Sequence, residues 1–141
     1  MSWLERTELL IKEQGIEKLQ QSQVLIVGLG GVGAFAAEFI VRAGVGNLTI
    51  VDGDTVSETN INRQLPALHN TIGKAKTEIM AERLKNINPT LQLTVITEFL
   101  TPERAWDIVT PTYDYVIDCI DTISPKLNLI RSAKRKKVKI V

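Results

Sequence analysis

A glycine-rich turn between an apolar run and a helical segment constrains the fold more than any other feature. Residues 24–27 read Val-Leu-Ile-Val, a β-branched and aliphatic run typical of a strand buried on both faces. The run stops at a G-x-G-x-x-G pattern with one additional glycine, and a helical pattern follows over 34–42. We therefore expect a strand–turn–helix unit whose amides and helix N-terminus face a phosphate group. The glycines are Gly28, Gly30, Gly31 and Gly33.

Strands and helices alternate along the remaining sequence. Further strands are predicted at 48–51, 91–96 and 115–120, and a final strand begins at 138–141. Helices are predicted over 74–88, from Pro102, and from Ser124 to 131–137, with two short helical pieces over 5–20 that break at Gly15. This alternation predicts an α/β, Rossmann-like fold, a mostly parallel sheet with helices on both faces and a ligand at the carboxyl ends of the strands.

Length and composition fit one domain over residues 1–141, because 44% of the 141 residues are apolar. The formal net charge of +1 neither demands nor excludes a nucleic-acid partner. A single cysteine, Cys119, rules out an internal disulfide, fits a reducing cytoplasm and is expected to pack in the core. No apolar run is long enough to cross a bilayer, so we expect no membrane partner. Because the sequence stops where a strand begins, we expect a domain that lacks its C-terminal part.

An acid at the tip of the second strand narrows the ligand class. Asp52 is placed to accept hydrogen bonds from ribose hydroxyl groups. The glycine pattern and this acid together describe NAD, FAD, SAM and ATP sites almost equally. A tight strand-to-helix turn without any ligand is the other interpretation.

The segment after this acid favours a triphosphate. A plain dinucleotide site has no need for the amide of Asn60 and the cations of Arg63 and Lys76 so soon after the ribose-binding acid. A triphosphate brings about four negative charges, which fixed donors must meet before an acyl oxygen approaches the α-phosphorus. Alternatively, Arg63 and Lys76 are ordinary surface residues.

Five short motifs occur together and in order along the chain. They are Gly28-x-Gly30-Gly31-x-Gly33, Asp52-x-Asp54, Asn60-x-Asn62-Arg63-Gln64, Gly73-x-x-Lys76 and Asp118-Cys119-x-Asp121. The set resembles the ThiF/MoeB/HesA superfamily of ubiquitin-activating-type adenylating enzymes. Within it, residues 113–121 and the following Pro125 and Lys126 most resemble the tRNA threonylcarbamoyladenosine dehydratase branch. Thr122 after Asp121 also favours that branch, since MoeB- and ThiF-like proteins usually have Asn there.

The resemblance implies an ATP-dependent enzyme that adenylates a carboxylate with the help of Mg²⁺. It implies that Asp121 organises Mg²⁺ and that Arg6 reaches into the site of the partner in a homodimer. Nucleotide-binding roles fall on Gly28, Gly30, Gly31, Gly33, Asp52, Asp54, Asn60, Arg63 and Lys76, and catalytic roles on Arg6, Arg63, Lys76 and Asp121.

Four functions remain open at this point. The first is activation of threonylcarbamoyladenosine in tRNA for a cyclising dehydration in the cytoplasm. The second is adenylation of the C-terminal glycine of a ubiquitin-like sulfur-carrier protein. A nicotinamide-dependent oxidoreductase is the third, although it leaves Arg63, Lys76 and Asp121 unexplained, and a catalytically inactive binding module is the fourth. The basic run 134–137 is interpreted as a solvated helix end, or as an RNA backbone contact if the substrate is tRNA.

Overall fold

The apolar run before the glycine motif forms one of the two inner strands of a four-stranded sheet. The structure, a computed structural model, describes residues 2–141. All neighbouring strands are parallel, and their order is β3-β2-β1-β4. The strands are β1 (Gln23–Val27), β2 (Asn47–Val51), β3 (Gln92–Ile96) and β4 (Tyr115–Asp118). The predicted α/β, Rossmann-like fold with a parallel sheet is therefore confirmed.

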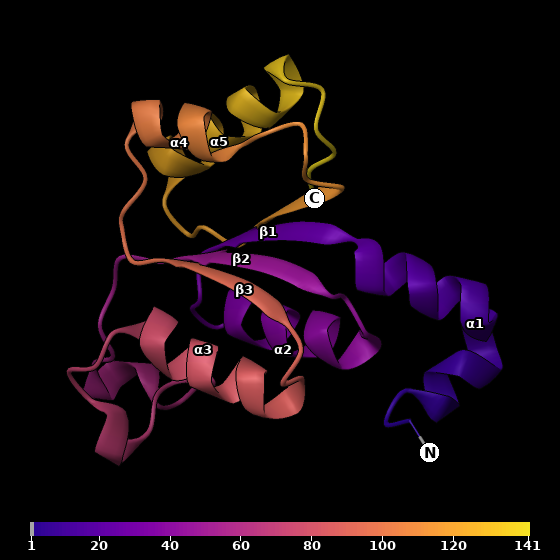
Figure 1. Cartoon of the computed structure of the whole chain (residues 1–141). Helices are drawn as coiled ribbons and strands as arrows, with labels where there is room; N and C mark the ends of the chain where they lie inside the picture. Colours follow the sequence, from indigo (N-terminus) through magenta and orange to yellow (C-terminus); the bar gives the residue numbers. More distant parts are fainter. Residues whose placement is uncertain (1) are drawn as a thin grey trace.

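Helices cover both faces of the sheet (Figure 1). One face packs against α2 (Gly33–Ala43) and α3 (Lys76–Ile87), and the other against α4 (Pro102–Ile108) and α5 (Ile123–Arg135). Successive residues of β1 enter opposite cores, Leu25 on the α5 side and Ile26 on the α2 side, and both are fully buried. Full burial of such a side chain contributes about 1.5–3 kcal/mol. Burial on both faces explains why this strand is a continuous apolar run.

One predicted detail is wrong, the position of the break in the N-terminal helix. The N-terminal helix α1 (Glu5–Gln21) breaks at Lys12, which has φ 65°, and continues through Gly15. Glycine is tolerated there because its missing side chain leaves room for Ile11, whose Cβ would lie 2.7 Å from an added methyl. Residues 138–141 lie where the start of a strand was predicted, and they pair in parallel with β4 through the bridge between Val116 and Ile140. Within residues 2–141, no helix is long and apolar enough to span a bilayer.

A carboxylate between two guanidinium groups joins the helices of one layer. Glu38 of α2 is only 9% exposed; its Oε1 accepts from Arg42 Nε at 3.0 Å and its Oε2 from Arg83 Nε of α3 at 2.5 Å. The hydrogen bond from Arg83 lowers the pKa of Glu38, against the opposing effect of burial. The paired charge therefore holds α2 and α3 together.

Replacing this carboxylate should destabilise the fold. We expect Glu38→Gln to lower the free energy of unfolding at pH 7 by about 1–3 kcal/mol, since a charge-assisted pair is lost. Because folding lowers the pKa of Glu38, the stabilisation is present above the ordinary carboxyl pKa and disappears as pH falls through the lowered value. Urea denaturation from pH 7 to pH 3 measures it, with the exposed Glu82→Gln on α3 as control. Equal losses from both variants at pH 7 would contradict the prediction.

Candidate functional site

A cavity of about 580 Å³ lies where the carboxyl ends of the strands meet. Val27 and Val51, the last residues of β1 and β2, form its floor with the segments that follow β3 and β4. A parallel sheet places such a crevice at this edge, and the volume is that of a small-molecule site. Within this part of the molecule, the fold brings residues of four separate loops together.

Two glycines of the first motif are required by backbone packing. Gly28 has φ 97°, and a Cβ added there would lie 2.5 Å from the carbonyl oxygen of Cys119. A Cβ added to Gly33 would lie 1.7 Å from the carbonyl oxygen of Gly28. Neither position has room for a side chain. These two residues therefore bend the chain sharply from β1 into α2.

The other two glycines are not needed by the fold. Neither Gly30 nor Gly31 has positive φ, and an added Cβ would lie 3.5 Å from Gln64 or 3.7 Å from Arg63, ordinary van der Waals distances. Both residues line the cavity. Their missing side chains keep its wall open and leave the backbone accessible to a ligand.

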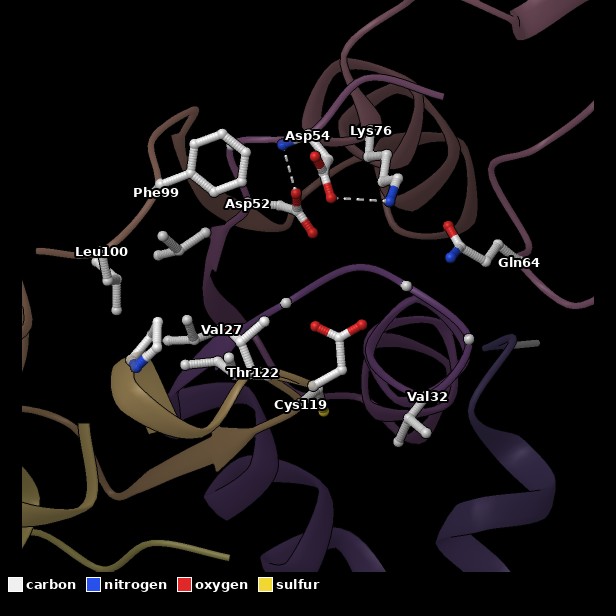
Figure 2. Close-up of a pocket in the computed structure, with 18 of the residues that line it drawn as sticks. Val27, Val32, Asp52, Asp54, Gln64, Lys76, Phe99, Leu100, Cys119 and Thr122 are labelled. Atoms are coloured by element: carbon white, nitrogen blue, oxygen red, sulfur yellow. Dashed lines mark hydrogen bonds and ion pairs between the residues drawn. The ribbon is translucent and has the colours of Figure 1, made fainter. Parts of the chain in front are cut away.

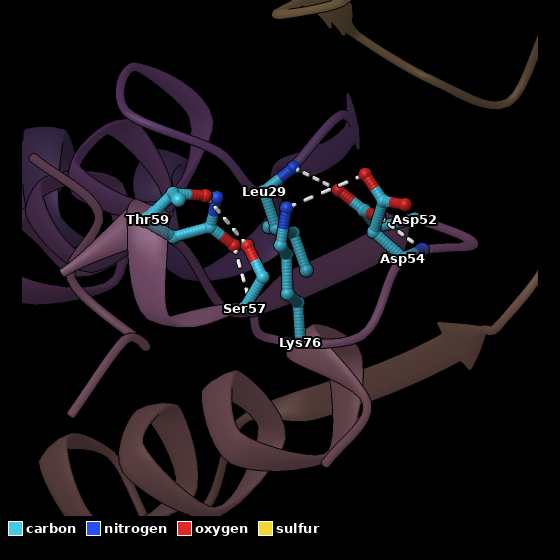
Figure 3. Close-up of polar contacts among 7 residues, drawn as sticks. Leu29, Asp52, Asp54, Ser57, Thr59 and Lys76 are labelled. Atoms are coloured by element: carbon cyan, nitrogen blue, oxygen red, sulfur yellow. Dashed lines mark hydrogen bonds and ion pairs between the residues drawn. The ribbon is translucent and has the colours of Figure 1, made fainter. Parts of the chain in front are cut away.

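Asp52, at the end of β2, ties the glycine turn to the neighbouring strand (Figure 3). Its Oδ2 accepts from the backbone N–H of Leu29 at 2.6 Å, and its Oδ1 accepts from the N–H of Asp54 at 2.7 Å. A carboxylate has about four lone-pair sites, so acceptor capacity remains on each oxygen. Asp52 therefore has a structural role beside the predicted contact to a ribose.

A buried lysine supplies positive charge to the cavity. Lys76, the first residue of α3, is 4% exposed, and its Nζ lies 3.4 Å from Oδ2 of Asp54 (Figure 3). That distance exceeds the roughly 2.7–2.9 Å of a strong charge-assisted hydrogen bond. The ammonium is therefore held by its partner loosely enough to bind an anion, and it is not an ordinary surface residue.

Three polar residues come from the short 3₁₀ helix η1 (Glu58–Asn60) and the turn that follows it. Asn60 caps this helix, since its Oδ1 accepts from Ser57 N at 3.0 Å, and Arg63 Nη1 donates to the carbonyl of Thr59 at 3.0 Å. Gln64 also lines the cavity, and its buried Oε1 has no hydrogen-bond partner within residues 2–141. Such an atom indicates a missing ligand or water. Gln64 belongs to a motif of the sequence but was not among the predicted site residues.

An apolar wall faces these polar groups (Figure 2). Phe99 and Leu100, from the loop after β3, lie on one side of the cavity, and Lys76 and Gln64 lie on the other. Gly53 permits this arrangement, because an added Cβ would lie 2.6 Å from the ring of Phe99. Phe99 and Leu100 were not among the predicted site residues, since nothing in the local sequence marks Phe99 as part of a site. A cavity with one apolar and one cationic wall suits a ligand that combines an aromatic ring with negative charge.

The segment after β4 is anchored by an ion pair. Asp118 Oδ2 lies 2.6 Å from Lys126 Nζ of α5, and its Oδ1 accepts from Ile120 N at 3.0 Å. Asp121 follows on this segment, is exposed and lines the cavity. Within residues 2–141, no three His, Cys, Asp or Glu side chains form a group that could hold a metal. A cation beside Asp121 would therefore take at most two ligands from side chains of these types.

Two predicted site residues do not line the cavity. Gly33 contributes through its backbone contact with Gly28 alone, and Arg6 is exposed on α1. The preceding Leu4 packs against Gly44, at the amino end of β2 and thus at the opposite end of the sheet (Figure 1). The remaining predicted residues line the same cavity: Gly28, Gly30, Gly31, Asp52, Asp54, Asn60, Arg63, Lys76 and Asp121.

Cys119 is expected to react slowly with alkylating reagents. It packs against the core as predicted, but it also lines the cavity. Burial raises the pKa of its thiol, and the neighbouring charge of Asp118 adds to this shift. Since the thiolate is the nucleophile, we expect the pH midpoint of iodoacetamide alkylation to be higher in the folded chain than in urea. Mass spectrometry follows a single site, and an equal or lower midpoint in the folded chain would contradict this assignment.

Comparisons with known proteins found relatives that match nearly the whole chain. The tRNA threonylcarbamoyladenosine dehydratase of Haemophilus influenzae is 44% identical over 132 residues, which are 94% of this chain and 51% of that protein. The molybdopterin-synthase adenylyltransferase of Escherichia coli is 38% identical over 127 residues, 90% of this chain and 51% of that protein. The crystal structure of the E. coli dehydratase in complex with ATP superposes with a TM-score of 0.94 at 40% identity, and covers 97% of this chain and 56% of that one.

The chain spans about half the length of the curated relatives it matches. The sequence model of the ThiF family matches residues 4–141, which include the complete sheet and every residue that lines the cavity. The chain therefore belongs to the ThiF family.

Proposed function

We propose that the chain binds ATP in this cavity and is the nucleotide-binding part of an enzyme that adenylates a carboxylate. The observation that carries the proposal is the pair Gly30 and Gly31. The fold does not require glycine at either position, yet both line the cavity and leave its wall open. The orphaned Oε1 of Gln64 beside them supports a ligand that forms polar contacts at the same place.

ATP fits the two walls of the cavity. The adenine ring packs against Phe99 and Leu100, and Asp52 accepts hydrogen bonds from the ribose. The triphosphate lies against the amides of the glycine turn and against Lys76 and Arg63. The crystal structure of the E. coli dehydratase in complex with ATP supports this assignment.

The reaction joins a carboxylate oxygen to the α-phosphorus and breaks the bond to pyrophosphate, which leaves with the electron pair. Lys76 and Arg63 offset the negative charge of the phosphate oxygens as this exchange proceeds. Mg²⁺, when bound, neutralises further charge on those oxygens. Asp121 would hold the ion with its carboxylate, beside substrate phosphates and the waters that Mg²⁺ usually keeps.

The carboxylate is that of threonylcarbamoyladenosine in tRNA, activated in the cytoplasm for loss of water. Dehydratase relatives at 44%, 41% and 40% identity support this substrate. Adenylation of a sulfur carrier's C-terminal glycine is the alternative, with relatives at 38–40% identity. Release of pyrophosphate in the presence of one substrate but not the other separates the two.

Binding of MgATP is the first test. Calorimetry should detect MgATP and not NADH. We expect Gly30→Ala to weaken MgATP binding by about tenfold, since its methyl displaces a phosphate from a backbone amide. The same variant should unfold within about 0.5 kcal/mol of the parent, because the added Cβ meets only ordinary contacts. Tighter binding of NADH than of MgATP would overturn the adenylation proposal.

The second test concerns Arg6, which we place in the site of a partner subunit. Its position at the far end of its own sheet supports action across a homodimer. Arg6→Ala and Asp121→Ala should each abolish pyrophosphate exchange. Mixing them should restore about a quarter of the parent activity, since half the dimers are mixed and each has one complete site. A mixture that stays inactive despite confirmed subunit exchange would show that Arg6 does not act in trans.

A further inference from the structure

Positive charge is concentrated in one short stretch, which we call the basic corner. Residues 131–139 contain six basic and no acidic residues, so the remaining chain has eleven basic against sixteen acidic residues. The near-neutral net charge therefore hides a cationic surface on an otherwise acidic protein. The residues of the basic corner are Arg131, Lys134, Arg135, Lys136, Lys137 and Lys139.

These cations are not neutralised within the part of the chain that the structure describes. The ion pairs of residues 2–141 involve other cations, Arg42, Lys76, Arg83, Arg104 and Lys126. All members of the basic corner except Lys136 are exposed. Cations in the last turn of a helix stabilise it through the helix dipole, which explains the presence of Lys134 and Arg135 in α5. The dipole does not explain Lys137 and Lys139, which lie beyond the end of the helix.

Lys137 occupies a position that favours glycine. Its φ is 57°, in the left-handed region. The N–H of Val138 donates to Ala133 O at 2.9 Å and that of Lys137 donates to Lys134 O at 3.2 Å, the pattern of a helix end that usually has glycine at this place. A side chain in this conformation destabilises the fold. The chain thus keeps a cation at a position where glycine would relieve strain.

Two exposed aromatic rings lie beside the cations. Nζ of Lys136 is 4.1 Å from the ring centroid of Trp106 on α4, and Nζ of Lys139 is 5.5 Å from that of Tyr115 at the start of β4. The two aromatic residues are 44% and 45% exposed. Cations interleaved with exposed rings form a surface on which nucleic-acid phosphates bind and unpaired bases stack.

The basic corner is separated from the nucleotide cavity by the length of one helix. Pro125, near the start of α5, lines the cavity, and the basic residues lie at the other end of this 13-residue helix. At 1.5 Å per residue the separation is roughly 20 Å. One nucleotide cannot span it, but a folded RNA can.

We propose that the basic corner binds the phosphate backbone of tRNA while the modified nucleoside lies at the cavity. The inference rests on the proposed tRNA substrate. Contacts to phosphates carry no sequence information. The basic corner therefore positions the tRNA, and the cavity selects the modified nucleoside.

The test uses the two lysines that have positive φ. Lys137→Gly should raise the melting temperature and weaken binding of an unmodified tRNA transcript roughly five- to tenfold at 0.1 M salt, the effect of one lost phosphate contact. Lys12→Gly, at φ 65° on α1, makes the same change away from the basic corner. It should raise the melting temperature and leave tRNA binding unchanged. Fluorescence anisotropy across a salt series measures both.

Unchanged tRNA affinity in Lys137→Gly would overturn the proposal, as would an equal loss in Lys12→Gly. Binding to vesicles of anionic phospholipid that is lost in Lys137→Gly, with no binding of tRNA, would assign the surface to membranes instead. MgATP calorimetry on the same variants separates this inference from the proposed function. If MgATP binding is intact and tRNA affinity is unchanged in Lys137→Gly, the basic corner alone is rejected. If the parent chain binds no MgATP and Lys137→Gly loses tRNA affinity, the nucleotide site alone is rejected.

Discussion

A backbone contact at the end of β1 holds the site together. Gly28 lies against the carbonyl of Cys119 after β4, and Gly33 lies against the carbonyl of Gly28 itself. No side chain fits between these segments, so the end of β4 and the start of α2 are fixed to the same turn. Asp52 adds β2 through its hydrogen bond to Leu29. The cavity is thus shaped mainly by main-chain packing, and its side chains provide the charge and polarity.

Local patterns were enough to predict most of the fold. Burial on both faces makes β1 a continuous apolar run, and the glycine turn follows from local backbone chemistry. The break in α1 was predicted wrongly because helix propensity favours it at Gly15, whereas the break lies at Lys12. Phe99 and Gln64 could not be identified from local patterns, since their roles depend on which loops meet at the end of the sheet.

α5 organises the molecule between its two proposed binding regions. Its first turns carry Lys126, which anchors the segment of Asp121 through Asp118, and its last turn opens the basic corner. The helix packs through Leu129 and Ala133 on the same core that supports Val27 and Val51. An RNA bound at the basic corner would therefore lie at a fixed distance and orientation from the nucleotide cavity.

The long ion pair between Lys76 and Asp54 makes the affinity of the proposed site depend on the negative charge of the ligand. An incoming anion must draw the ammonium away from a carboxylate 3.4 Å distant, and the exposed Asp54 then loses its partner to water. A triphosphate provides enough negative charge for this exchange, whereas a nucleotide stripped of pyrophosphate provides much less. In the proposed reaction, Asp54 pairs with Lys76 again once pyrophosphate has left. The pair that the triphosphate would separate would thereby favour release of the AMP product.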